Sequence, residues 1–320
     1  MAHEKPTKNE RREQAREQAR QAREAEKKRE KRNRLLLQGG VVAGVLVILA
    51  VVGLVLAQTL KPAGPGPVNM ASGAVTFGAD LAVFETPALQ PDAKREAPAG
   101  TTWDELPVDV TIYVDYMCPA CGAFEQTYGE MLTDYTETGE ITLSVFPLTF
   151  LDATSMGTKY STRAANLMGC VVEQQPEVAF ALHNRLLSAE VQPSEGTTAL
   201  SDDELIAQAE AAGATADEQL QQCVKDQRFA DFFQGNTKFA TETGLWGLAD
   251  GARLLDSTGQ NFQPEGAQRL ISTPTVIVNG QQWSQGRDGD LETYLLKVKG
   301  ELGKNGSSNG ASGEDSAATE

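Results

Sequence analysis

The sequence predicts an α/β domain that follows a single transmembrane helix. Three observations carry this prediction. Residues 35–60 contain no charged side chain, and they are long enough to cross a hydrocarbon core of about 30 Å. After them, short segments rich in β-branched residues alternate with helical patterns, an order typical of α/β folds. Between two of the predicted strands lies a long, predominantly helical stretch, residues 154–252.

The charge of the chain is unevenly distributed. The 320 residues include 28 Lys or Arg and 44 Asp or Glu, which gives a formal net charge of -16. Residues 1–34 hold 13 of the basic and 7 of the acidic residues, a net charge of +6. The residues after 60 hold the other 15 basic and 37 acidic residues, a net charge of -22. So acidic a chain is not expected to bind nucleic acid.

Residues 35–60 are interpreted as a transmembrane helix that remains uncleaved. A cleaved signal peptide is the alternative, but its apolar region would measure about 7 to 15 residues and end in an A-x-A-like site. The sequence AQT at 57–59 fits such a site poorly. The basic segment 1–34 precedes the helix, and only Lys61 lies close behind it. Because basic flanks stay in the cytoplasm, we expect a single-pass protein of the cell membrane with a cytoplasmic N-terminus and an extracytoplasmic domain.

Composition divides the rest of the chain into a linker, a folded domain and a tail. Residues 61–69 are rich in Pro and Gly, which favours a linker, and a second such stretch at 91–102 predicts a long loop. Residues 303–320 are rich in Gly, Ser and Asn without apolar periodicity, and they are predicted to be disordered. The folded domain is therefore expected at residues 70–302.

The elements of this domain can be predicted in order. Strands are predicted at residues 74–77, 81–84, 108–116, 141–150 and 275–278. The third of these runs into a helix, residues 122–138, whose apolar residues recur with helical spacing. The last strand is followed by Asn279 and Gly280, which predict a turn. The amphipathic pattern of residues 290–302 predicts a final helix.

Cys118 and Cys121 form a C-x-x-C pair between the third strand and its helix. The first turn of a helix has unpaired backbone N–H groups and the positive end of the helix dipole, which stabilise a thiolate. Pro119 suits the first helical position, because its missing N–H would have had no intrahelical acceptor. A thiol with a lowered pKa is a good nucleophile and a good leaving group. We therefore predict that Cys118 exchanges disulfides with a partner and that Cys121 resolves the mixed disulfide.

Three other interpretations of this pair are a structural disulfide, a zinc site and two buried free thiols. A disulfide that closes so small a loop constrains the unfolded chain little. A zinc site normally needs a second pair of ligands with similar spacing, whereas Cys170 and Cys223 are widely separated. We therefore predict no metal or cofactor. The strand-to-helix context favours redox chemistry over all three interpretations.

Two segments of the sequence carry a family resemblance. Residues 114–125, VDYMCPACGAFE, resemble the active-site segment of the DsbA family of thioredoxin-fold thiol–disulfide oxidoreductases. Residues 272–280, STPTVIVNG, resemble that family's cis-proline loop and the strand after it. The similarity covers about residues 108–302 and, with the extra cysteine pair, is closest to the membrane-anchored actinobacterial type. It implies a thioredoxin-like fold with an inserted helical domain.

The resemblance also implies partners and an activity. The implied substrates are secreted or cell-envelope proteins with reduced cysteines, into which the CPAC site introduces disulfides. The implied reoxidising partner is a DsbB-like or VKOR-like membrane protein. Two alternatives remain open: the same site acts as a disulfide isomerase or reductase, or the domain is a non-catalytic binding module whose groove holds a partner strand.

The resemblance further implies roles for residues around the cysteines. It implies that Pro274 is cis and packs against the Cys118 sulfur, and that Thr273 offers backbone groups to an extended substrate strand. From the residues alone, a trans proline that opens a strand is equally possible. Ala120, which follows Pro119, stands where the best-known oxidases have His. We therefore expect the pKa of Cys118 to lie below that of a free thiol, but to be less depressed than in a C-P-H-C protein.

One segment departs from the family pattern. Residues 249–270 lengthen the path from the helical block to the cis-proline strand, where the family usually moves quickly. We expect this insertion to form a loop or hairpin near the active face.

The remaining cysteines and titratable residues have simpler interpretations. Cys170 and Cys223 lie in predicted helices of the inserted block, and an even number of extracytoplasmic cysteines suggests a structural disulfide. A second redox pair is the alternative, but it lacks the C-x-x-C spacing. Asp115 is expected to cap the start of the helix and Glu125 to be solvated. His183 is expected on a helix surface or in the core.

Overall fold

A computed structural model describes residues 64–91, 93, 95 and 107–310, together with short pieces between residues 17 and 51. The chain divides into two units, Met1–Pro62 and Ala63–Glu320. The described pieces of the first unit are helical. No helix in the described part of the chain is long and apolar enough to cross a membrane, and most of the predicted span at 35–60 lies outside the described residues.

A five-stranded mixed sheet forms the centre of the second unit, with the strand order β1-β3-β2-β4-β5. The strands are β1 (Val75–Phe77), β2 (Val108–Val114), β3 (Ile141–Pro147), β4 (Thr275–Val278) and β5 (Gln281–Trp283). β2 and β3 are parallel, and the other three pairings are antiparallel. The three inner strands are buried at every residue. This explains why their sequences are nearly continuous runs of apolar and β-branched residues.

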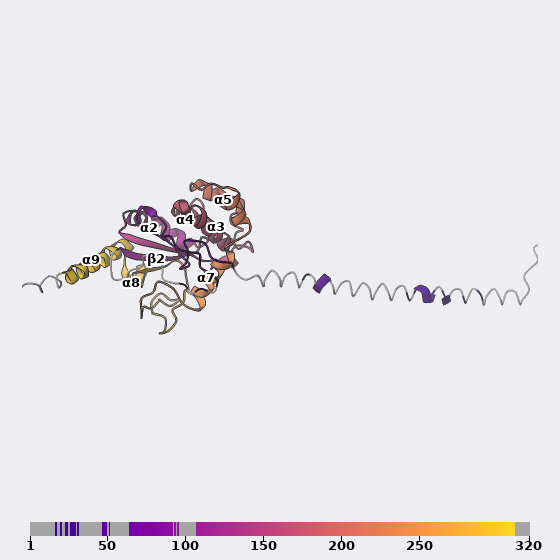
Figure 1. The fold of residues 1–320 in the computed structure, drawn as a ribbon. Coiled ribbons are helices and arrows are strands. Elements are labelled where there is room, and N and C mark those ends of the chain that lie inside the picture. The colour runs from indigo at the N-terminus through magenta and orange to yellow at the C-terminus, as the bar shows by residue number, and fades with distance from the viewer. Residues whose placement is uncertain are drawn as a thin grey trace, which may run out of the picture. The chain divides into compact units, whose positions relative to one another are not determined.

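Helices connect and cover the strands (Figure 1). They are α2 (Pro119–Glu137), α3 (Tyr160–Gln174), α4 (Ala179–Leu186), α5 (Asp202–Ala211), α6 (Glu218–Lys225), α7 (Ala230–Glu242), α8 (Gln285–Asp288) and α9 (Leu291–Gly310). Short 3-10 turns are η1 (Ala79–Leu81), η2 (Asp152–Thr154) and η3 (Pro176–Val178). The α2 helix joins the parallel strands β2 and β3, and the block α3–α7 is inserted between β3 and β4. The predicted α/β class is therefore confirmed.

The sheet separates two clusters of buried side chains. Along β2, Val110 and Ile112 belong to the larger cluster, which includes residues of α2, α3, α4 and α9. Tyr113 belongs to the smaller cluster, together with Leu254 and Leu270 from the insertion. Because neighbouring side chains of a strand point to opposite faces, the insertion packs on the face of the sheet opposite to the larger cluster.

The structure differs from the sequence-based prediction at three elements. Residues 81–84 do not form a strand; the chain makes only an isolated bridge between Phe77 and Val83. The strand β5 was not predicted. The α9 helix continues to Gly310, so residues 303–310 are helical where disorder is predicted. Once Leu291 and Leu295 are buried in the core, extension of an existing helix is far easier than nucleation of a new one.

Candidate active site

Cys118 and Cys121 lie at the N-terminus of α2, directly after β2. Cys118 is the N-cap residue, and Pro119 is the first residue of the helix. The backbone N–H groups of Cys121 and Gly122 donate to the Cys118 carbonyl at 3.0 and 3.2 Å, which closes the first turn. Both thiols are free. Cys118 is 7% exposed and Cys121 is 1% exposed, so Cys118 is the more accessible of the two.

The loop before β4 faces Cys118. The peptide bond between Thr273 and Pro274 is cis, and the Cys118 thiol donates to the Thr273 carbonyl at 3.3 Å. The two segments meet because β2 and β4 are neighbours in the sheet, with Tyr113 opposite Thr275. The structure thus brings together the two segments that carry the family resemblance.

The two thiols have opposite electrostatic environments. The pKa of Cys118 is lowered to about 6, chiefly by the hydrogen bond from Cys121, although burial opposes the shift. The side chain of Thr273 and the backbone N–H groups of Cys121 and Ala120 lower it further. Burial raises the pKa of Cys121 well above its ordinary value. At neutral pH the pair therefore combines a thiolate at Cys118 with a protonated thiol at Cys121. The lowered pKa of Cys118 agrees with the expectation that it lies below the pKa of a free thiol.

Asp115, three residues before Cys118, is fully buried and accepts hydrogen bonds from three neighbouring segments. Its Oδ1 accepts hydrogen bonds from the Met117 N–H at 2.9 Å and from Ser161 Oγ at 2.7 Å, and its Oδ2 accepts from the Leu151 N–H at 2.8 Å. Burial raises its pKa to about 6. The expectation that Asp115 caps α2 is wrong, because Cys118 is the N-cap residue and the carboxylate instead joins the turn to α3 and to the loop after β3.

His183 of α4 is buried between the α2 helix and the turn before it. Its Nδ1 lies 3.3 Å from the Tyr116 hydroxyl, and its Nε2 lies 3.7 Å from Glu125 Oε2. The Glu125 side chain is only 11% exposed. The expectation of a solvated Glu125 is therefore wrong, because the helical block covers this side of α2.

Gln192, which follows α4, lies at this site although no motif in the sequence predicts it. Its Nε2 donates to the Cys118 carbonyl at 2.9 Å and to the Tyr116 carbonyl at 3.5 Å. Its side chain lies so close to Gly122 that a Cβ atom there would overlap it. The glycine directly after the C-x-x-C motif was a visible signal of close approach, but no pattern in the sequence marks Gln192 as the group that approaches.

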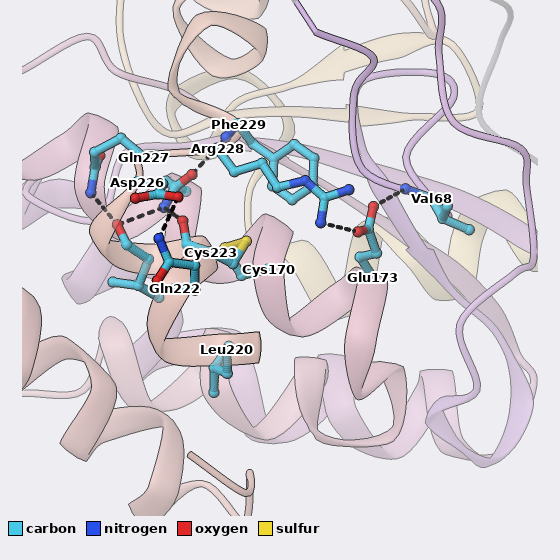
Figure 2. Close-up of a disulfide and its surroundings, with 12 residues drawn as sticks. Val68, Cys170, Glu173, Leu220, Gln222, Cys223, Asp226, Gln227, Arg228 and Phe229 are labelled. Atoms are coloured by element: carbon cyan, nitrogen blue, oxygen red, sulfur yellow. Dashed lines mark hydrogen bonds and ion pairs between the residues drawn. A yellow bond between two sulfur atoms is a disulfide. The ribbon is translucent and has the colours of Figure 1, made fainter. Parts of the chain in front are cut away.

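Cys170 and Cys223 form a disulfide that joins α3 to α6, with an S–S distance of 2.06 Å (Figure 2). Both residues are buried. Beside the disulfide, Glu173 forms an ion pair with the Arg228 guanidinium, with an N–O distance of 2.9 Å. It also accepts a hydrogen bond from the Val68 N–H at 3.2 Å. The structure thus places the pair within the helical block as a cross-link. Among the described residues, no group of three or more His, Cys, Asp or Glu could hold a metal ion.

Comparison with known families agrees with this geometry. Residues 104–246 match a family model described as thioredoxin. The second unit therefore has a thioredoxin-like α/β fold, and we call it the thioredoxin domain. Within the thioredoxin domain, the C-x-x-C turn, the cis-proline loop and the helical block between β3 and β4 form the arrangement that the resemblance to the DsbA family implies.

Several solved structures are similar to the thioredoxin domain. Oxidised DsbA of Mycobacterium tuberculosis is 22% identical, with a TM-score of 0.48 over 72% of this chain and 93% of that one. Oxidised BdbD of Bacillus subtilis is 19% identical, with a TM-score of 0.46 over 75% and 100%. MdbA of Corynebacterium diphtheriae, a thiol-disulfide oxidoreductase, is 17% identical, with a TM-score of 0.46 over 76% and 98%.

A curated relative of the thioredoxin domain is the serine/threonine-protein kinase PknE of Mycobacterium tuberculosis. It is 29% identical over 110 residues, which make up 34% of this chain. The match spans only 19% of the kinase's own length.

Proposed function

We propose that the chain is a membrane-anchored, extracytoplasmic thiol–disulfide oxidoreductase that introduces disulfides into secreted proteins. The observation that carries the proposal is the asymmetry of the two thiols. Cys118 is the more exposed, has a pKa lowered to about 6 and faces the Thr273 carbonyl, whereas Cys121 is buried with a raised pKa. A thiol with a low pKa is a good leaving group. Cys118 is therefore readily released when a second substrate thiolate attacks the mixed disulfide between Cys118 and the substrate.

The reaction consists of two thiol–disulfide exchanges. A substrate thiolate attacks Cys118 Sγ, the bond between Cys118 and Cys121 breaks, and Cys121 leaves as a thiolate and takes up a proton. A second substrate thiolate then attacks the substrate sulfur of the mixed disulfide, and Cys118 leaves as a thiolate. The substrate has lost two electrons and gained a disulfide, and the enzyme has become a dithiol.

The location and the reoxidising partner belong to the same proposal. The uncharged run at 35–60 and the change from +6 before it to -22 after it support a single anchor with the thioredoxin domain outside the cytoplasm. The reduced enzyme must pass two electrons to an acceptor before it can act again. A DsbB-like or VKOR-like membrane protein supplies that acceptor in this proposal.

Oxidation of a reduced, unfolded protein tests the proposed activity. The full-length protein is purified in detergent, oxidised at Cys118 and Cys121, and mixed with a substrate whose free thiols are counted over time. We expect each oxidised enzyme to remove two substrate thiols and to end as the dithiol. Cys118→Ser is the matched control, which has lost the attacked sulfur. Substrate thiols that persist with the oxidised wild-type protein at the level of this control would contradict the proposal.

A further inference from the structure

Residues 64–70, which we call the strap, pack against the helical block. Four of these residues are buried. A Cβ atom on Gly66 would overlap the ring of Phe232 in α7, so only a glycine allows this close approach. Pro67 lies against α3, where a Cβ atom on Gly169 would come within 3.0 Å of the proline ring. The strap is therefore fixed to the domain by shape as well as by burial.

The segment 86–89 is bonded to the strap through the backbone. The N–H of Gly66 donates to the Leu89 carbonyl at 2.8 Å, and the N–H of Asn69 donates to the Thr86 carbonyl at 2.9 Å. The N–H of Thr86 donates in return to Asn69 Oδ1 at 3.1 Å. These hydrogen bonds do not involve the helical block, so they hold the strap independently of it.

Further hydrogen bonds join the strap to the C-terminal turn of α3. The Asn69 side-chain amide donates to the Val172 carbonyl at 3.3 Å, and the Val68 N–H donates to Glu173 Oε2 at 3.2 Å. The other oxygen of this carboxylate, Oε1, lies 2.9 Å from the Arg228 guanidinium. Figure 2 shows Glu173 between Val68 and Arg228, with a dashed line to each. One carboxylate therefore connects the strap to the segment after α6.

The Cys170–Cys223 disulfide fixes the position of Arg228 relative to Glu173. Cys170 precedes Glu173 by three residues, about one turn of α3. The Arg228 N–H donates to the Cys223 carbonyl at 3.2 Å. Without the S–S bond, α6 is free to move relative to α3, and the ion pair is weakened. An unpaired Glu173 side chain regains its rotamer freedom, so the Val68 N–H loses a fixed acceptor.

A pocket of about 650 Å³ lies beside the disulfide and includes Cys223 in its wall. Cys223 is 4% exposed, whereas Cys170 is fully buried. A thiol that enters the pocket therefore reaches the sulfur of Cys223 rather than that of Cys170. The wall carries three carboxylates and one guanidinium, so it favours an uncharged thiol over an anionic one.

We propose that docking of the strap depends on the Cys170–Cys223 disulfide, and that a small uncharged dithiol releases the strap by reducing it. A thiolate of the dithiol attacks Cys223 Sγ, and Cys170 leaves as a thiolate and takes up a proton. The second thiol of the dithiol attacks its own sulfur in the mixed disulfide, and Cys223 leaves. The dithiol ends as a cyclic disulfide, and its two electrons have passed to the protein.

Release of the strap lengthens the chain that leads into the sheet. The strap lies between the predicted membrane span at 35–60 and β1. Its seven residues reach up to about 25 Å when they are extended. In the membrane-anchored protein proposed above, release would therefore give the thioredoxin domain a longer tether. This consequence rests on the proposed anchor, whereas the docking of the strap does not.

Hydrogen exchange tests the dependence. The full-length double variant Cys118→Ser, Cys121→Ser is purified in detergent with Cys170 and Cys223 as its only disulfide. Exchange of the strap amides is measured by mass spectrometry before and after treatment with dithiothreitol, and thiol labelling reports the reduction. We expect strap exchange to become about tenfold faster, because a hydrogen bond to a charged group contributes at least this factor. Exchange in β3 should stay unchanged.

Two carboxylate variants, made in the same double variant, locate the connection. Glu173→Ala removes the acceptor of the Val68 N–H, so we expect fast strap exchange in both redox states. Glu218 lies in the wall of the same pocket, and Glu218→Ala is the matched control. It should keep the tenfold change. A change that persists in full in Glu173→Ala would overturn the connection through this carboxylate.

The remaining outcomes decide the inference without reference to the oxidase function. A disulfide that dithiothreitol does not reduce in the folded protein overturns it, and so does strap exchange that is unchanged after reduction. Equal acceleration in the strap and in β3 also overturns it, because that pattern indicates general unfolding. None of these results bears on substrate oxidation, since the double variant lacks both active-site thiols. The comparison of redox states decides the matter even if Glu173→Ala does not fold.

Discussion

Cys118 is the residue on which the proposed chemistry depends, and its ionisation is directly measurable. The hydrogen bond from Cys121, with a smaller effect of the Thr273 side chain, holds its pKa at about 6 against the opposing effect of burial. In the reduced protein, thiolate ultraviolet absorbance should therefore rise with a midpoint near pH 6, and the rate of alkylation should follow the same curve. Cys118→Ser should abolish this transition. A midpoint at or above about 8.5, the value of a free thiol, would contradict the account.

Gln192 provides a second test at the residue scale. Its amide lies against the Cys118 carbonyl at 2.9 Å, so Gln192→Glu brings a negative charge close to the thiolate. A like charge within about 4–6 Å disfavours the charged form. We expect the pKa of Cys118 to rise by roughly half a unit to one unit in this variant. Gln192→Ala, which removes the amide without adding charge, is the control. An identical titration in the two variants would show that Gln192 lies farther from the sulfur.

Asp109 makes stability depend on pH in an unusual direction. It is fully buried in β2, where it accepts hydrogen bonds from Thr111 and Thr142, and burial raises its pKa from 3.8 to about 6. The folded protein therefore binds more protons than the unfolded chain between these values. The free energy of unfolding should fall as pH rises from about 4 to about 6, by roughly 1–3 kcal/mol from this group.

Asp109→Asn should remove this contribution. We expect the difference in unfolding free energy between pH 4.5 and pH 7.5, measured with urea, to shrink by roughly 1–3 kcal/mol in the variant. Some pH dependence should remain, because Asp115 is shifted in the same direction. An unchanged difference would mean that Asp109 ionises normally in the folded protein.

At the scale of elements, the Cys170–Cys223 disulfide joins α3 to α6 across a sequence separation of 53 residues (Figure 2). Loops of this length stabilise by about 3 to 4 kcal/mol through the restriction of the unfolded chain. The double variant Cys170→Ser, Cys223→Ser should therefore unfold at a lower urea concentration by an amount equivalent to this loss. Its Cys118 titration should stay unchanged, because the cross-link lies within the helical block. Mass mapping that finds Cys170 free in the native protein would contradict the cross-link.

The sequence predicted those elements whose patterns are local. The residues of β2 and the start of α2 follow from a β-branched run and from a proline directly after Cys118. The strand β5 could have been predicted too, because the turn at Asn279 and Gly280 is a hairpin signal. The residues between Leu81 and Phe84 were mistaken for a strand because they are apolar, although only one bridge forms there.

The contacts between elements were less predictable. Asp115 and Glu125 were assigned ordinary helix roles from their positions beside the C-x-x-C motif. Their actual partners, Ser161 and His183, belong to the helical block, and Gln192 comes from the same block. These contacts depend on how the block packs on α2, which no local periodicity encodes. Motif spacing therefore predicted the cysteine pair of the candidate site, and tertiary packing supplied the groups around it.

At the scale of the whole molecule, a charge gradient along the chain accompanies a candidate redox site in one domain. The change from a basic N-terminal segment to an acidic domain supports placement of the thiol pair in a compartment where disulfides persist. The direction of electron flow at the site is then set by the reduction potential of the pair, which distinguishes an oxidase from an isomerase or reductase. All of these functions share one step, the mixed disulfide at Cys118.

Trapping of that mixed disulfide tests the central claim most directly. In full-length Cys121→Ser, the Cys118 thiolate attacks a disulfide of an unfolded polypeptide, one substrate sulfur leaves as a thiolate, and no second thiol is present to release the adduct. We predict that a covalent complex accumulates and that a reducing agent dissolves it, whereas Cys118→Ser forms none. Absence of a complex with Cys121→Ser, or equal complexes with both variants, would contradict the account.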